Sequence, residues 1–474
     1  MSEKTEKKLM GKAFAFLWLS ETSFDFGSAL MGFALGVWVF QTTGSAEQFA
    51  WTILSAAVPA LLVTPFAGAL ADRYDRRWVI AGCDVASALL VVGLAMLLFY
   101  GELVVEHLYV FNAITSVVGT IRNPSYQAAV GAIVPKDKLT QANGMIGFTD
   151  GILQIGGPLA AGYLMASIGL EGIMVIEVIA VAAGAICIFT ALSHAKHAIH
   201  GEKPAEASSI MRNLLDSWQA ALSYFNTHRL MIGLVLYAVI QESLLVLVSA
   251  MVTPLVLSTE TSDVLGLIMT AGALGGLIGS IAMVVLNLER HLMMWVLLTD
   301  AILSAAIMVA GLTASPIVWG ICAFFAMGAG AASGTCAGAL WMRKTPEGKR
   351  GSIFALLGAL DLLALCAVML VGGTIGEHVF EPALAVGGAW AESVGNYVGT
   401  GPGRGYAFLF VVSGGFCTLV SLIALLFPRL RKLDALVPDC DVDPGAQAAK
   451  ADGEGNGLDG LPVAARPATA SPPA

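Results

Sequence analysis

The sequence predicts an all-α membrane protein whose twelve transmembrane helices form two six-helix halves. Hydrophobic residues make up 57% of the 474 residues and charged residues only 12%, about half of the charged share of an average soluble domain. The apolar residues gather in runs of about 20 or more, the length that crosses a bilayer as a helix. This composition excludes a soluble enzyme, a nucleic-acid-binding protein and a disordered scaffold.

Twelve apolar runs follow one another along the chain, six on each side of a polar stretch. The first six cover residues 14–40, 50–71, 78–100, 107–133, 141–168 and 172–193. The second six cover residues 230–257, 264–287, 292–313, 316–340, 352–375 and 406–428. We therefore expect an N-terminal half (1–193), a cytoplasmic linker with an interfacial helix (194–229), a C-terminal half (230–430) and a disordered cytoplasmic tail (431–474).

Lys and Arg residues gather on one side of the predicted membrane. They occur before the first run, in the loops after the second, fourth, sixth, eighth and tenth runs, and after the last run. The loops on the opposite side contain a single basic residue of this kind, Arg404. Because basic residues mark the cytoplasmic side, both termini are predicted to be cytoplasmic. We expect a multi-pass protein of the cell inner (cytoplasmic) membrane.

Metal and nucleotide motifs do not stand out in the sequence. The seven cysteines lie mostly singly inside apolar runs, without the spacing of metal ligands. No Gly-Lys-Ser/Thr phosphate loop occurs, which disfavours ATP-driven transport by this chain. We expect no metal, no cofactor and no enzymatic activity.

Two pairs of sites indicate that the halves are repeats of each other. Gly68 closes the second run and Gly279 holds the corresponding place in the eighth, an offset of 279 − 68 = 211 residues. Pro135 follows the fourth run and Pro346 follows the tenth, and 346 − 135 is again 211. Because each half has an even number of runs, the repeats are parallel, related by an axis along the membrane normal.

One loop resembles the signature of a known transporter family. Gly68-Ala-Leu-Ala-Asp72-Arg73-Tyr-Asp75-Arg76-Arg77 is similar to the loop 2–3 motif of the major facilitator superfamily. The family usually has Gly where this chain has Asp75. The stretches Gly82-Cys83-Asp84, Val130–Pro135 and Gln141-Ala142-Asn143-Gly144 resemble its drug:proton antiporter branch, which includes macrolide-efflux and enterobactin-exporter proteins. The resemblance covers about residues 12–430 and implies the major facilitator fold.

The resemblance also implies roles for two groups of residues. Gly68, Asp72, Arg73, Arg76, Arg77 and Asp84 would form a gate that holds one conformation until its charge cluster breaks. Simple anchoring to the cytoplasmic side is the alternative for Arg76 and Arg77. Gly156, Gly157, Pro158 and Gly162 resemble the antiporter motif of exporters, for which a packing kink without a role in export is the alternative.

A few charged residues lie deep inside the apolar runs. The acids near mid-membrane depth are Asp25, Asp150, Glu242 and Asp361, with Glu21 one turn before Asp25, and the deep basic residue is Arg122. A charge at this depth costs at least about 2.5–3.5 kcal/mol, so such groups pair, face a cavity or stay neutral. One Arg neutralises about one carboxylate. The other acids are left without a basic partner and are candidates for carrying a proton. We expect Asp25 to pair with Arg122, and a structural hydrogen-bonding role is the alternative for each acid.

Other acids and the aromatic residues complete the candidates. Asp84 and Asp300 lie nearer the cytoplasmic ends of their runs, where a structural role is favoured, and Glu177 is expected to be solvated near an outer end. Aromatic residues that could contact a bulky substrate are Trp18, Tyr126, Phe148 and Tyr237. Trp38 and Trp341 are assigned instead to the membrane interfaces.

Together these features predict a proton-coupled exporter of a small amphipathic compound, such as a drug, siderophore or secondary metabolite. The two halves would rock about a central site in alternating access. An importer or facilitator of a small polar metabolite is the alternative on the same fold, and a membrane-embedded receptor or lipid-handling protein is the alternative from another class. The expected partners are protons, a small-molecule substrate and the lipid bilayer, with no nucleic acid, and we expect a monomer.

Overall fold

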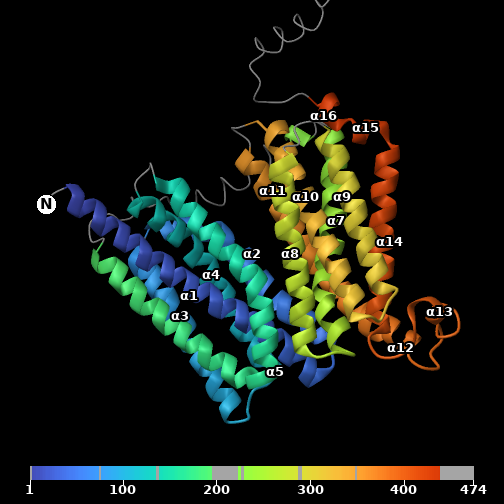
Figure 1. Cartoon of the computed structure of the whole chain (residues 1–474), viewed down its shortest axis with the longest axis horizontal. Coiled ribbons are helices and arrows are strands. Elements are labelled where there is room, and N and C mark those ends of the chain that lie inside the picture. Colours follow the sequence, from blue (N-terminus) through green and yellow to red (C-terminus); the bar gives the residue numbers. More distant parts are fainter. Residues whose placement is uncertain are drawn as a thin grey trace, which may run out of the picture.

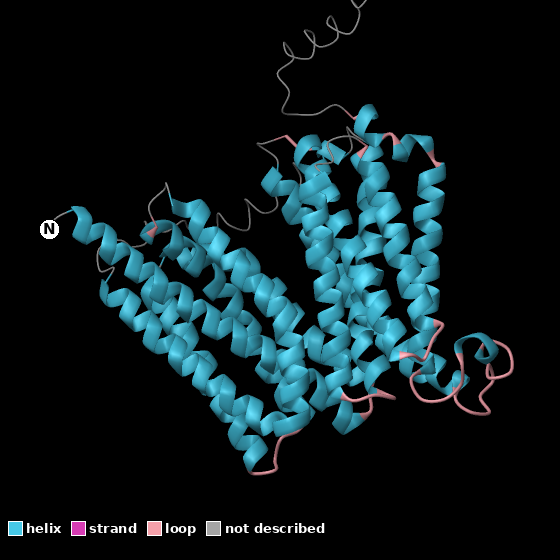
Figure 2. Cartoon of the chain, in the orientation of Figure 1, coloured by secondary structure: helices cyan, strands magenta, loops and turns pink. Residues whose placement is uncertain are grey.

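The computed structural model describes residues 3–73, 76–134, 138–194, 223–225, 229–286, 291–346 and 350–437. Figure 2 shows helices joined by short loops, and no strand occurs within these ranges. The predicted linker 194–229 lies almost entirely outside the described residues. The predicted tail is described as far as Val437.

Five long helices build the N-terminal part of the chain. They are α1 (Glu3–Thr43), α2 (Ala46–Arg73), α3 (Arg76–Phe99), α4 (Val105–Ile133) and α5 (Leu139–His194). The 56-residue helix α5 is interrupted at Gly169, whose φ of 67° and ψ of −172° are not helical. Glycine adopts this conformation without the steric cost of a Cβ atom, so α5 contains two consecutive spans.

The C-terminal part contains six long helices and several short ones. The long helices are α7 (Arg229–Leu257), α8 (Ser262–Leu286), α9 (Leu292–Gly311), α10 (Pro316–Lys344), α11 (Arg350–Ile375) and α14 (Arg404–Leu426). A π-helical turn, η3 (Gly376–Phe380), continues α11 and leads into α12 (Glu381–Leu384) and α13 (Gly395–Val398). The chain ends its described part with α15 (Pro428–Arg431) and α16 (Leu433–Leu436).

The lengths of the helices fit a membrane. Ten helices in the described ranges are long and apolar enough to cross a bilayer. One of these spans, Gln141–Thr190, has 50 residues, about 75 Å of helix and more than twice the ~30 Å hydrocarbon core. With α5 counted as two spans and the 29-residue α4 added, the helices agree with the expected twelve. The prediction of an all-α multi-pass membrane protein is confirmed.

The two sets of helices meet at one end of the molecule. In Figure 1, α1–α5 and α7–α14 converge at the end that carries α12 and α13, here called the distal face. They diverge toward the end that carries the N-terminus and α16, here called the terminal face. One apolar core cluster joins Phe40 and Ala50 to Met251 and Leu255 across the distal end. The distal ends of the halves are therefore packed together.

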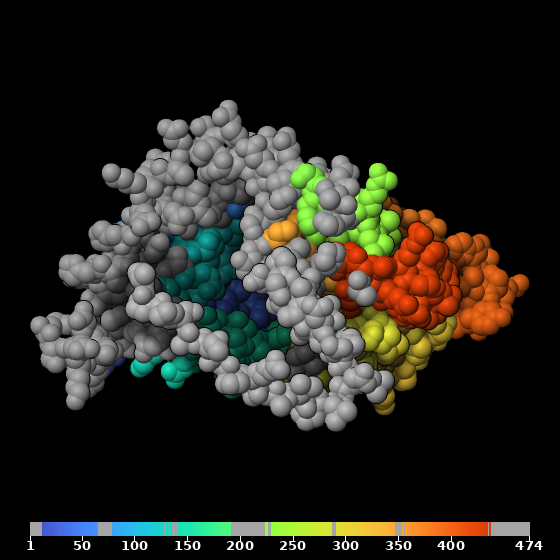
Figure 3. All heavy atoms as spheres, turned by 90° about the horizontal axis from the view of Figure 1, so that it is seen from above, coloured from blue at the N-terminus to red at the C-terminus, as the bar shows by residue number. Residues whose placement is uncertain are grey.

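Near the terminal face the two halves have separate cores. Leu17 and Tyr126 belong to one buried cluster formed by N-terminal helices, and Met231 and Leu340 belong to another formed by C-terminal helices. Figure 3 looks onto this face and shows teal and blue atoms on one side and yellow to red atoms on the other. The structure thus represents a state that is closed at the distal face.

Candidate transport site

A buried charge cluster ties three helices of the N-terminal half together. Arg122 in α4 is 2% exposed, and its Nε donates a 2.7 Å hydrogen bond to Oδ1 of Asp84 in α3. Its Nη1 donates a short hydrogen bond to Oε2 of Glu21 in α1. The guanidinium carbon lies 4.1 Å from the centre of the Phe24 ring. One cation thus faces two carboxylates. The two charge-assisted hydrogen bonds and the cation–π contact stabilise this arrangement.

The expected pairing of Arg122 with Asp25 is therefore replaced by pairing with Glu21 and Asp84. Asp25 lies one helical turn beyond Glu21 on α1 and is half-buried. Asp84, which the sequence assigns to the gate, lies instead in this buried cluster. In the packed structure, the side chains of Glu21 on α1 and Asp84 on α3 point at the guanidinium of Arg122.

Glu177 is buried rather than solvated. It is 4% exposed, and its Oε2 has no hydrogen-bond partner. It packs against α1 at Gly27, where an added Cβ would collide with the Glu177 carboxylate. The prediction of a solvated Glu177 is wrong because its helix turns this side chain toward α1 and not toward the distal loop.

The aromatic candidates occupy different environments. Nε1 of Trp18 donates a 3.1 Å hydrogen bond to Oγ1 of Thr149, which joins α1 to α5. Phe148, the preceding residue, is 69% exposed, and Asp150 is exposed too. Tyr126 lies fully buried in the N-terminal apolar cluster. In this state, Tyr126 therefore packs inside the N-terminal half and is not accessible to a substrate.

The gate motif is described only in part. Gly68, Asp72 and Arg73 lie near the terminal end of α2, and Arg76 and Arg77 begin α3. Their side chains lie outside the described part of the structure. The role of the gate motif stays a prediction.

The antiporter-like motif lies where the halves approach each other. A Cβ added at Gly162 in α5 would lie 2.7 Å from the carbonyl oxygen of Ser262 and 3.0 Å from Cα of Gly266 in α8. A Cβ added at Gly266 would lie 2.6 Å from the carbonyl oxygen of Pro158. Gly157 is buried near Ala29, whereas Gly156 has open space beside it. Small residues thus allow backbone contact between α5 and α8.

An acidic cavity lies inside the C-terminal half. It has a volume of about 210 Å³ and is lined by residues of α7, α9, α10, α11 and α14. Glu242, Asp300 and Asp361 line it, each from a different helix, and none of the described lining residues is Lys, Arg or His. We refer to it as the acidic cavity. Three acids that the sequence places inside apolar runs thus line the same cavity.

Hydrogen bonds organise one wall of the acidic cavity. The Tyr237 hydroxyl lies 2.8 Å from Oδ2 of Asp300 and 3.0 Å from Oγ of Ser421. Nε2 of Gln241 donates to the Tyr237 oxygen at 3.0 Å and to Ser421 at 2.5 Å. Ser304 also lines the cavity, is 1% exposed, and its Oγ has no hydrogen-bond partner. A buried hydroxyl without a partner is uncommon in proteins.

A second, largely apolar cavity adjoins the first. It has a volume of about 260 Å³ and is lined by α7, α8, α9, α10 and α14, together with Gln154 and Pro158 of α5. Leu245, Val248 and Ile307 line both cavities. We refer to this second space as the apolar cavity. The antiporter-like motif contributes Pro158 to its wall.

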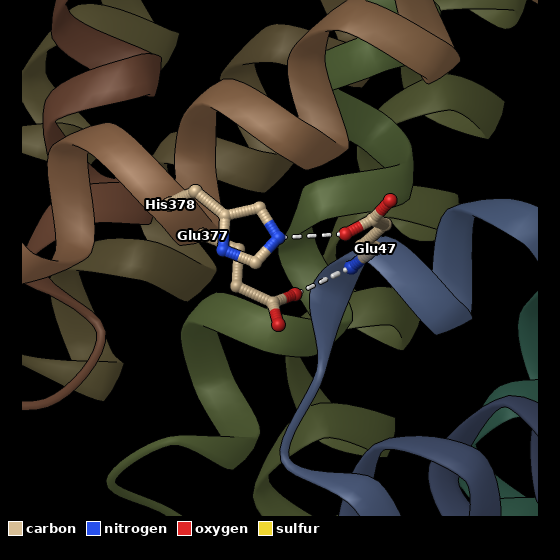
Figure 4. A group of neighbouring side chains, drawn as sticks. All are labelled: Glu47, Glu377 and His378. Atoms are coloured by element: carbon tan, nitrogen blue, oxygen red, sulfur yellow. Dashed lines mark hydrogen bonds and ion pairs between the residues drawn. The ribbon is translucent and has the colours of Figure 1, made fainter.

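Polar side chains join the halves at the distal face. Nε2 of His378 lies 2.8 Å from Oε2 of Glu47, and Oε2 of Glu377 accepts bonds from the Ser45 hydroxyl at 2.8 Å and the Glu47 backbone N–H at 2.7 Å. Figure 4 shows Glu377 and His378 of η3 turned toward the start of α2. One ligand atom from each of Glu47, Glu377 and His378 lies within 4.8 Å of the others, a spacing that could hold a metal ion.

Several of these residues escape sequence reasoning. Gln241, Ser304 and Ser421 are common uncharged polar residues within apolar runs, and their type alone gives no signal. Glu377 and His378 follow the eleventh run in a loop with few basic residues. Their position at the end of a span, opposite the short loop that holds Glu47, is the signal that could have found them.

The fold and these sites define a multi-pass membrane transporter. Residues 17–376 match the model of the Major Facilitator Superfamily, and the chain belongs to this family. Its members are transporters and not enzymes. The predicted family and fold are confirmed.

Sequence identity to individual characterised proteins is low. Macrolide efflux protein A of Streptococcus pyogenes is 26% identical over 175 residues, which cover 37% of this chain and 43% of the relative. The chain thus spans less than half the length of this macrolide relative. The staphyloferrin A transporter of Staphylococcus aureus is 25% identical over 282 residues, covering 55% of this chain and 66% of the relative.

Solved structures show the same fold. A bacterial homologue of the iron transporter ferroportin, in an inward-facing state, superposes with a TM-score of 0.64. It is 17% identical in sequence, and the match covers 87% of this chain and 98% of that chain.

Proposed function

We propose that the protein is a proton-coupled exporter of a small amphipathic compound. The observation that carries the proposal is the acidic cavity, where Glu242, Asp300 and Asp361 face one space and no basic residue lines it within the described part of the chain. Carboxylates inside a membrane protein that lack a cationic partner mark ion or proton pathways. Transport without coupling would need no such group of acids.

The distribution of Lys and Arg supports a cytoplasmic terminal face. With this orientation, the state that is closed at the distal face faces inward. The acidic cavity would then take up its substrate from the cytoplasm or the inner leaflet. Rocking of the two halves would carry the loaded site to the outside, as alternating access requires. We expect the protein to act in the cell inner membrane as a monomer.

Proton exchange would take place at Glu242, aided by Asp361 and by the N-terminal acids Asp25 and Asp150. Protonation from outside would neutralise the site and favour its return to the inward-facing state. Release of the proton to the cytoplasm would prepare the site for the next substrate. Glu21 is less suited to this role, because its carboxylate is already bonded to Arg122.

Two findings favour export over import. The antiporter-like motif lies at the contact between α5 and α8, where it can control the approach of the halves. A relative that matches this chain over 43% of its own length is named macrolide efflux protein A.

Inverted membrane vesicles with an imposed pH gradient test this proposal. Erythromycin, ethidium and rhodamine 6G serve as probes. We expect accumulation of at least one probe, abolished by an uncoupler and reduced at least about tenfold by Glu242→Gln. The exposed distal residue Glu392 provides the matched control Glu392→Gln, which should transport normally. Gradient-driven accumulation that survives Asp25→Asn together with Glu242→Gln would contradict the proposal.

A further inference from the structure

Glu47, Glu377 and His378 form a group of metal-ligating side chains at the distal face, and none of them lines either cavity. One ligand atom of each residue lies within 4.8 Å of the others. We propose that this group binds a divalent transition-metal ion such as zinc, and that the bound ion holds the distal ends of the two halves together. The inference goes beyond the proposed function, because it concerns neither the substrate nor the coupling ion.

The donor atoms of this group suit a transition metal. Carboxylate oxygens and an imidazole nitrogen are common ligands of zinc, whereas sites for magnesium and calcium use oxygen atoms alone. Two ligands of one tetrahedral zinc ion, each about 2.1 Å from the metal, lie about 3.4 Å apart. His378 Nε2 and Glu47 Oε2 are already 2.8 Å apart. A small movement of these side chains would therefore admit the ion between them.

The charge at the distal face also favours a cation. The distal loops contain one Lys or Arg residue, Arg404, and its Nη1 donates to the carbonyl oxygens of Thr313 and Val398. Among the described residues, Glu47 pairs with His378, and neither glutamate of the group pairs with Lys or Arg. Because a metal ion binds the neutral form of an imidazole, the two carboxylates leave negative charge that a divalent cation would offset.

Packing between α11 and α2 sets the distance between the ligands. A Cβ added at Gly373 would lie 3.1 Å from Cβ of Ala50 and 3.5 Å from Cα of Glu47, so the two backbones approach closely here. The π-helical turn η3 follows directly after α11, and it turns Glu377 and His378 toward the start of α2 (Figure 4). Single π-helical turns of this kind are frequent at functional sites.

Neighbouring groups orient one ligand and leave the group open to solvent. The Ser45 hydroxyl and the Glu47 backbone N–H donate to Oε2 of Glu377 at 2.8 Å and 2.7 Å. Outer bonds of this kind hold a metal-binding carboxylate in place. The side chain of His378 is 59% exposed and that of Glu47 is 33% exposed. An ion can therefore enter from the distal side, and water can complete its coordination.

The ligands come from both halves, so the site is complete only while the distal ends are together. Glu47 lies at the start of α2, whereas Glu377 and His378 lie in η3. An ion that binds only the distal-closed state stabilises that state by mass action and must leave before the distal face opens. The sequence expectation of no metal is based on cysteine spacing, and ligands 330 residues apart leave no such pattern.

Zinc binding to the purified full-length protein in detergent, at constant pH, tests the site. By isothermal titration calorimetry we expect Glu47→Gln and His378→Ala each to weaken zinc binding at least about tenfold. The exposed distal control Glu392→Gln should bind zinc like the wild-type protein. Melting temperatures close to that of the wild-type protein, measured without metal, show that each variant is folded. Wild-type zinc affinity in both Glu47→Gln and His378→Ala would overturn the site.

Hydrogen–deuterium exchange tests whether the ion holds the halves together. At a zinc concentration ten times the Kd, we expect the amides near Ala50 and Met251, in the cluster that joins the halves, to exchange about tenfold more slowly. His378→Ala should abolish this effect, and magnesium should not reproduce it. Zinc that binds through His378 without slowing exchange would refute the role in closure. Equal slowing by magnesium would refute a transition-metal site in favour of simple charge screening.

Discussion

His378 and Glu47 join the two halves of the transporter at the distal face, with 2.8 Å between Nε2 and Oε2. The neighbouring Glu377 carboxylate accepts two more bonds from the start of α2. These contacts exist only while the distal ends are together. They therefore stabilise the state that is closed at this face and must break before the opposite state forms.

Loss of the Glu377 carboxylate should favour opening of the distal face. Glu377→Ala removes the acceptor of two hydrogen bonds, each worth about 0.5–1.5 kcal/mol, so we expect the open fraction to rise roughly fivefold or more. His378→Ala should have a smaller effect, because the imidazole is exposed. Hydrogen–deuterium exchange of distal amides that do not bond Glu377, such as those near Ala50 and Met251 in the cluster that joins the halves, measures opening. Exchange as slow as in Glu392→Gln, the matched loop control, would contradict this role.

Bulk at Gly162 should keep the distal ends apart. An added Cβ would lie 2.7 Å from a backbone oxygen of α8, and overpacking of this kind costs about 1–3 kcal/mol. We expect Gly162→Ala to disfavour the distal-closed state roughly tenfold and Gly162→Leu to prevent it. Cross-linking of cysteines introduced at the distal ends of α5 and α8 reports the contact.

Gly156→Ala is the control for this substitution, because no heavy atom beyond its chain neighbours and the backbone of its own helix lies within 4 Å of a Cβ added there. It belongs to the same motif and the same helix. If Gly156→Ala and Gly162→Ala impaired cross-linking equally, a change in the helix itself, and not the lost contact with α8, would explain the result.

Removal of the Arg122 charge should destabilise the N-terminal half. Arg122→Gln leaves Glu21 and Asp84 buried without a cation, a loss that costs about 3–5 kcal/mol for a buried pair. We expect a clear fall in the melting temperature of the protein in detergent. Glu21→Gln added to Arg122→Gln should recover part of the loss by removing one of the unpaired charges. No recovery in the double variant would show that lost packing of Arg122 on Phe24 dominates.

The sequence predicts this fold well because the signals of a membrane protein are local. The length of an apolar run and the loops that carry Lys or Arg are each readable without knowledge of packing. The depth of Asp25, Glu21 and Glu177 along their helices is readable too. The direction in which each side chain points is not, because it depends on how the helices rotate against one another.

The partner choice of Arg122 shows this limit. Glu21 and Asp25 are four residues apart, so both lie on nearly the same side of α1. Only the packed structure brings Glu21, with Asp84 of α3, to the guanidinium. Glu242 and Asp361 share one cavity although 119 residues separate them (361 − 242), and no sequence spacing reveals that meeting.

Neutralising Glu177 should stabilise the protein without impairing transport. The residue is 4% exposed and its Oε2 has no hydrogen-bond partner, so burial of its charge is uncompensated. An amide of the same size carries no charge to bury. We expect Glu177→Gln to raise the melting temperature, with gradient-driven transport unchanged. Glu177→Ala is the comparison, since it removes the charge but also leaves a cavity against Gly27 and should lower the melting temperature. A Glu177→Gln variant that is stable but no longer couples transport to the pH gradient would instead place Glu177 on the proton pathway.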